Sequence, residues 1–277
     1  MNVTEQNVLH HASCITKRKY SGRQFTAVYG VPPNIAAVAW NHMVQLDTYQ
    51  GSNISLTDFL MVLHFLKIYS NETVLSNLFH TTEKTFRSKY KKALSLLSSI
   101  PVICWENRNL VENSRHRAKV SIDGTDCRIF EPTPFDTKWY SHKHNGPGLR
   151  YEVGICIVSG HIVWVSGPHE CGIPDITIAR EGILHILEDG EKIIADGGYR
   201  GEAAIWHKGH NQYSAKLEGV VRARHETANK KLKDFGVLTQ RFRHHLSLHG
   251  FCFHACANLV QLIILHKLPL FNLENKE

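Results

Sequence analysis

The sequence predicts an α/β protein in which a small all-helical region precedes a larger domain of alternating strands and helices. Apolar residues recur with a helical period through residues 34–97, whereas β-branched and aromatic runs begin near residue 119. Strand and helix patterns then alternate as far as residue 266. A chain of 277 residues can bury a sizeable core, as one large domain or two smaller ones.

The first part of the chain divides at the Gly30-Val31-Pro32-Pro33 break. Residues 1–33 are polar and basic, and we expect them to form a flexible segment. A helical domain is expected over 34–100, with helices at 34–46, 55–69, 72–79 and 83–97. Ser55 and Asp58 have the spacing of a capping box. The connection at 80–82 is short enough for a helix-turn-helix.

The helix expected at 83–97 carries a basic face. Its apolar stripe contains Phe86, Tyr90 and Leu97, and its cations point elsewhere: Lys84, Arg87, Lys91 and Lys92. One interpretation is a recognition helix that binds DNA through these four residues. The other is a small helical bundle with a charged outer face, and the sequence leaves both open.

The second part predicts strands at 119–130, 151–158 and 161–166, the last two joined as a hairpin. A helix at 175–187 follows Pro174. A short strand at 191–195, a further strand near 212–216, a helix around Glu226 and a final helix at 244–266 complete the order.

Three acidic residues in this part have contexts that suit metal-dependent phosphoryl transfer. Asp123 lies in an apolar strand pattern, Asp196 ends another strand before two glycines, and Glu226 lies on the charged face of an amphipathic helix. Singly, they fit a polar strand residue, a plain turn and a helix with ordinary ion pairs. Jointly, they are the oxygen ligands that Mg²⁺ or Mn²⁺ prefers. Asp126 should point to the opposite face of the strand from Asp123, so it is not included among the candidate metal ligands.

The order of these motifs resembles that of DDE transposases. Arg222, Glu226 and Lys233 match most of the family's Tyr-Arg-Glu-Lys signature, and Asp-Gly-Thr-Asp and Ala-Asp-Gly-Gly-Tyr resemble its two aspartate blocks. The similarity covers roughly residues 115–265, and the chain resembles Harbinger-type transposases and related bacterial insertion-sequence transposases. The signature Tyr is replaced by Gly219, so a phosphate contact from that side chain is not expected.

The resemblance implies an RNase H-like catalytic domain at 115–270, with a mixed sheet flanked by helices. It implies a catalytic triad of Asp123, Asp196 and Glu226 holding two divalent metal ions, Mg²⁺ or Mn²⁺. The expected substrate is double-stranded DNA, namely transposon terminal inverted repeats and target DNA. Synapsis of two ends implies a homodimer or higher oligomer, and a separate DNA-binding subunit stays open. Arg222 and Lys233 would contact DNA phosphates.

The segment 139–150 mixes aromatic and cationic side chains, including Lys143. This composition fits a loop that contacts nucleic acid, with Lys143 as a DNA-binding residue, and it fits a structured connection equally well. The formal net charge of +7 also suits a phosphate-rich partner.

The remaining expectations concern compartment and alternative functions. Seven scattered Cys indicate a reducing compartment. The resemblance implies the nucleus in a eukaryote and the cytoplasm or nucleoid in a bacterium. No signal peptide or membrane span is expected. Cys252, Cys256 and nearby His residues suggest zinc, but core packing is the simpler interpretation. The alternatives to a transposase are a host-adopted, non-catalytic DNA-binding protein, a structure-specific nuclease and a zinc-stabilised partner-binding module.

Overall fold

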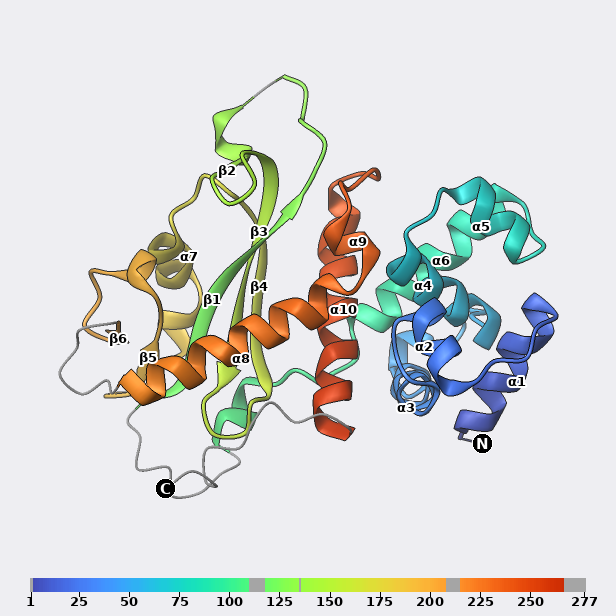
Figure 1. Cartoon of the computed structure of the whole chain (residues 1–277), viewed down its shortest axis with the longest axis horizontal. Coiled ribbons are helices and arrows are strands. Elements are labelled where there is room, and N and C mark those ends of the chain that lie inside the picture. Colours follow the sequence, from blue (N-terminus) through green and yellow to red (C-terminus); the bar gives the residue numbers. More distant parts are fainter. Residues whose placement is uncertain (1, 110–117, 135, 208–214, 267–277) are drawn as a thin grey trace. The chain divides into compact units, whose positions relative to one another are not determined.

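The computed structural model describes residues 2–109, 118–134, 136–207 and 215–266 (Figure 1). These residues form two compact units. Unit 1 comprises the described residues within 1–102, 232–240 and 244–266, and unit 2 comprises those within 103–231 and 241–243.

Unit 1 is helical. Its elements are α1 (Glu5–Thr16), α2 (Gly22–Tyr29), α3 (Pro33–Val44), η1 (Asp47–Tyr49), α4 (Leu56–Ile68), α5 (Glu72–Leu78), α6 (Glu83–Ser98), α9 (Gly236–Thr239) and α10 (Ser247–His266). The capping box of Ser55 and Asp58 is confirmed at the start of α4. The all-helical N-terminal region is therefore as predicted.

Residues 1–33 differ from the expected irregular segment, because they form α1 and α2. Both helices begin with capping boxes, from Thr4 and Ser21, and both bury apolar side chains such as Val8 and Phe25. Each helix is short and mostly polar and buries only two side chains, which are four positions apart, so the apolar residues are too few to reveal a helical period.

Helix α10 packs against α6 and α3 within unit 1. It is long and apolar enough to span a membrane by length and composition, contrary to expectation, yet 67% of its apolar window is buried in the protein. Cys252 and Cys256 are fully buried on it. Asn258 Nδ2 donates to the carbonyls of Leu97 and Ser98 at the end of α6, at 3.1 and 3.0 Å. These contacts are those of a core helix.

Unit 2 is built on a mixed sheet flanked by helices, which confirms the predicted fold class (Figure 1). Its strands are β1 (Ala118–Arg128), β2 (Tyr140–Ser141), β3 (Gly146–Cys156), β4 (Ile162–Glu170), β5 (Lys192–Ile194) and β6 (Ile205–Trp206). β1 pairs antiparallel with β3 and parallel with β5, β3 also pairs with β2 and β4, and β5 pairs parallel with β6.

Helical elements complete unit 2: η2 (Trp105–Asn109), η3 (Thr137–Trp139), α7 (Asp175–Glu181), η4 (Ile183–Ile186), η5 (Gly197–Tyr199) and α8 (Ala215–Lys233), of which the last two residues belong to unit 1. The strand expected at 212–216 is not formed at 215–216, which begin α8, and its other residues lie outside the described part. β6 was not predicted, because two residues carry too little periodicity.

The sheet has two distinct faces. Val120, Ile122 and Ile193 pack with Ala179 of α7 and Ile183 of η4. On the other face, Ile157 and Ile194 pack with Val221 of α8. Because side chains alternate along a strand, Ser121 and Asp123 of β1 face α8, whereas Gly124 and Asp126 face α7.

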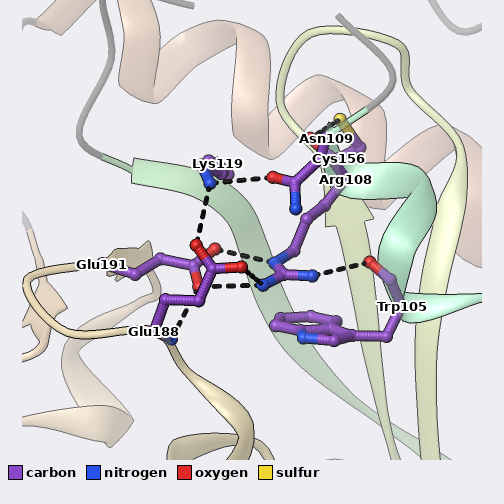
Figure 2. Close-up of polar contacts among 7 residues, drawn as sticks. All are labelled: Trp105, Arg108, Asn109, Lys119, Cys156, Glu188 and Glu191. Carbon is purple, nitrogen blue, oxygen red and sulfur yellow. Dashed lines mark hydrogen bonds and ion pairs between the residues drawn. The ribbon is translucent and has the colours of Figure 1, made fainter.

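A buried ion-pair network ties the start of unit 2 to the turn before β5 (Figure 2). Arg108 Nε donates to Glu191 Oε1 at 2.9 Å, and Nη2 donates to Glu188 Oε1 at 2.8 Å. Lys119 Nζ, on β1, lies 3.5 Å from Glu188 Oε2 and donates to Asn109 Oδ1 at 2.8 Å. The side chains of Arg108 and Glu191 are only 4% and 2% exposed, so each charge depends on its partner.

Candidate active site

Asp123 and Asp196 are brought together by the parallel pairing of β1 with β5. The last register pair places Ser121 of β1 opposite Ile194 of β5. Asp123 and Asp196 each lie two residues further along the same two segments and therefore lie side by side. Both residues are in phase with the face that α8 covers. The parallel pairing thus places Asp123, in the middle of β1, beside Asp196, which lies just beyond the carboxyl end of β5.

Helix α8 is fixed against this face by polar contacts. His225 Nε2 and Ser121 Oγ are 2.9 Å apart, and Asn229 Nδ2 donates to Asp123 Oδ2 at 3.2 Å. The buried guanidinium of Arg224 donates to the carbonyls of Ile157 and Val158 at the end of β3. Burial lowers the pKa of His225 to about 4, so the imidazole is neutral at this contact.

A cavity of about 510 Å³ lies between β1, the end of β5 and α8. Its lining contains all three predicted acids, Asp123, Asp196 and Glu226. The other lining residues are Ile122, Ile194, Ala195, Gly197, Val221, Arg222 and His225. Residues separated by more than 100 positions in the sequence therefore share one cavity, together with Arg222.

The three acids are not gathered around one point in this conformation. Glu226 accepts a hydrogen bond from Arg222 Nε at 3.0 Å, and the two side chains are 66% and 79% exposed. Within the described ranges, no group of three His, Cys, Asp or Glu residues is close enough to hold a metal ion. The donor chemistry still fits a hard divalent cation, since the cavity offers carboxylate oxygens from three separate elements.

The electrostatics of Asp123 reflect burial balanced by nearby charge. Burial raises the pKa of its carboxyl, the Lys143 ammonium lowers it, and the Asp196 carboxylate raises it further. Lys143 Nζ donates to the carbonyl of Gly124 at 2.6 Å, directly beside Asp123. Thus Lys143, predicted as a DNA-binding residue, lies next to the acids.

A second polar layer on the α7 face of the sheet was not found from the sequence. Asp126 is bound through both carboxylate oxygens by Arg150, which also binds Asp175. Glu152 lies opposite Gly124 in the β1–β3 register and accepts from Trp164 Nε1 at 3.0 Å. The sequence feature that could have indicated this layer is a pair of charged residues, Arg150 and Glu152, inside an otherwise apolar strand pattern.

The other predicted DNA-binding residues fall in different places. Lys84, Arg87, Lys91 and Lys92 are exposed on α6 of unit 1. Arg87 is paired with Glu72, whose Oε2 accepts from Nε at 2.8 Å. Lys233 is half-buried at the end of α8. Gly219 is exposed on α8, and nothing lies within 4 Å of where a Cβ would stand.

Comparison with known proteins agrees with this architecture. Residues 122–261 match a family described as DDE superfamily endonuclease, a span that contains Asp123, Asp196, Glu226 and every lining residue of the cavity. No curated protein and no solved structure matches the chain. The family match covers half of the chain. The chain therefore belongs to the DDE superfamily of endonucleases.

Proposed function

We propose that the protein is a DNA transposase that cleaves, and also joins, DNA strands at transposon ends, with Asp123, Asp196 and Glu226 as its catalytic acids. The observation that carries this proposal is the single cavity lined by all three acids within a chain of the DDE endonuclease superfamily. The same proposal includes its substrate, which is double-stranded DNA with transposon terminal repeats, and its assembly as a homodimer or higher oligomer. It also includes its location, which is the nucleus in a eukaryote and the cytoplasm or nucleoid in a bacterium.

The superfamily implies dependence on a divalent metal. Asp123, Asp196 and Glu226 would hold two such ions, Mg²⁺ or Mn²⁺. When bound, the ions would supply an activated water and neutralise charge on the scissile phosphate. Asp123 and Asp196 would be held in place by the sheet, and Asn229 would orient Asp123 through its amide.

Glu226 must turn from Arg222 toward the two aspartates before the triad is complete. The cost is small, because an exposed ion pair four residues apart on a helix contributes roughly 0.3–0.5 kcal/mol. The released Arg222 guanidinium would then be free to bind a DNA phosphate with two donors. Lys143, beside Gly124, would bind a second phosphate as a point charge.

The decisive experiment is nicking of supercoiled plasmid with and without candidate terminal repeats. Wild type should cut only with Mg²⁺ or Mn²⁺, and Asp196→Asn and Glu226→Gln should lose cutting while retaining DNA binding and fold. Asp189→Asn, an exposed carboxylate of unit 2, is the matched control and should cut normally.

The outcomes separate the candidate functions. Cutting that depends on terminal repeats supports transposition, whereas cutting without repeat dependence supports a structure-specific nuclease. Undiminished cutting by Glu226→Gln would refute its catalytic role. Tight DNA binding without cutting by wild type would favour the host-adopted binding protein or a requirement for a separate subunit.

A further inference from the structure

Asp175, the first residue of α7, lies against two glycines that stand beside the proposed catalytic aspartates. A Cβ built on Gly124 would lie 3.0 Å from Asp175 Oδ1, and a Cβ built on Gly198 would lie 3.1 Å from Asp175 Oδ2. Gly124 follows Asp123 directly, and Gly198 lies two residues after Asp196. One carboxylate therefore spans the two segments, and it fits because both positions are glycine.

This contact lies just beyond the point where the two strands stop pairing. The last β1–β5 register pair is Ser121 opposite Ile194, and the chain enters η5 directly after Asp196. Gly198 N donates to Asp196 Oδ1 at 2.8 Å, which couples the position of Gly198 to the Asp196 carboxylate. A displacement of Gly198 would therefore move Asp196.

Asp175 is itself held by Arg150. Arg150 Nη1 donates to Asp175 Oδ1 at 3.0 Å and to the carbonyl of Ile173 at 3.2 Å. Its other donors bind both oxygens of Asp126, at 2.8 and 3.1 Å, and Ser141 Oγ donates to Asp126 at 2.5 Å. The guanidinium is thus fixed on two sides, because Asp126 is anchored within the sheet.

Asp175 acts from the face opposite to the cavity. Gly124 faces α7, whereas Asp123 faces α8, and Asp175 is absent from the described cavity lining. The Asp175 side chain is 19% exposed and engaged by Arg150. Besides the field of its own charge, which reaches the Asp196 carboxylate, its contribution to metal binding would therefore pass through the Gly124 and Gly198 backbone.

We propose that Asp175, clamped by Arg150, is a positioning residue that sets the spacing between Asp123 and Asp196 and thereby the affinity of the site for divalent metal. The inference rests on the proposed metal-dependent function. Partners that orient metal ligands commonly change metal affinity or activity by about 10–100-fold when they are replaced.

The test measures Mn²⁺ binding by electron paramagnetic resonance of the free ion, for wild type, Asp175→Asn and Asp189→Asn. Asp175→Asn preserves volume but loses the ion pair with Arg150, so we expect Mn²⁺ affinity to fall about 10–100-fold with unchanged stoichiometry. Asp189→Asn should match wild type. A purely structural role would instead lower the fraction of binding-competent protein and leave the affinity unchanged.

A second variant protects the test against misfolding of Asp175→Asn. Gly124→Ala retains the Asp175 charge but crowds its carboxylate, whereas Gly146→Ala on β3 meets nothing within 4 Å and is the control. We expect weaker Mn²⁺ binding only for Gly124→Ala. Wild-type affinity in both Asp175→Asn and Gly124→Ala overturns this inference alone, whereas a wild-type protein that neither binds Mn²⁺ nor cuts DNA overturns the proposed function as well.

Discussion

At the scale of single residues, Glu152 is a buried carboxyl whose ionisation opposes folding. Burial raises its pKa to about 7, from a value near 4.5 in an exposed chain. Because the folded state holds this proton more tightly, the group's contribution to stability is most favourable below about pH 4.5 and declines as the pH rises to about 7. The decline amounts to about 3 kcal/mol.

Glu152→Gln should remove this decline, since Gln keeps an oxygen that accepts from Trp164 but carries no charge. Urea unfolding without metal from pH 4.5 to 8 is the measurement, and the stability difference between variant and wild type should grow through that range. The exposed residue Glu131, changed to Gln, is the control. Parallel pH profiles for Glu152→Gln and wild type would contradict the prediction.

At the scale of elements, the Arg108 network joins η2 to the turn before β5 and so supports the strand that leads to Asp196 (Figure 2). Arg108→Met leaves the Glu191 carboxylate buried without its cation and should destabilise the protein by about 3–5 kcal/mol. Replacing both residues, as Arg108→Met with Glu191→Leu, should recover most of that loss, because the uncompensated charge is gone.

Chemical denaturation of the single and double variants measures this coupling. Arg180→Met is the matched control, because its pair with Glu202 is exposed and should contribute only about 0–1 kcal/mol. A double variant as unstable as Arg108→Met would show that the network stabilises by packing rather than by charge compensation.

The elements that the sequence predicted well are those with a clear periodicity. The helices α3 to α6, strand β1 and the amphipathic α8 all follow from apolar spacing, and Asp123, Asp196 and Glu226 stand out by their contexts. The layer of Asp126, Arg150 and Asp175 was missed. The start of α7 at Asp175 was predicted, but the contacts among the three residues depend on the β1–β3 register and on the packing of α7 against the sheet, which no local pattern specifies.

At the scale of the whole molecule, the sequence predicted contiguous domains, whereas the compact units are assembled from separate segments. Unit 1 takes 1–102 together with 232–240 and 244–266. The predicted boundaries at 33, 100 and 115–270 stay predictions, but α10 is a core helix of unit 1. Its contacts with α6 join residues about 160 positions apart, and apolar spacing cannot indicate such a partner.

The last prediction concerns DNA binding by unit 1. If α6 presents its basic face to DNA, Lys84→Met and Lys91→Met should each weaken binding and reduce the slope of log affinity against log salt by roughly one. The matched control is Lys89→Met on the same helix, because Lys89 Nζ donates to the Asn53 carbonyl at 2.7 Å and contacts Asp58 at 3.4 Å. An ammonium engaged within the protein releases fewer counterions on binding, so its loss should leave the slope nearly unchanged.

Fluorescence anisotropy in the Glu226→Gln background measures this binding without cleavage. If all three variants keep the salt slope of the parent protein, α6 is assigned to a helical bundle with a charged outer face. A reduced slope for Lys84→Met and Lys91→Met alone would instead assign DNA affinity to unit 1, separately from the acids of unit 2, because substitutions on α6 leave the cavity lining intact.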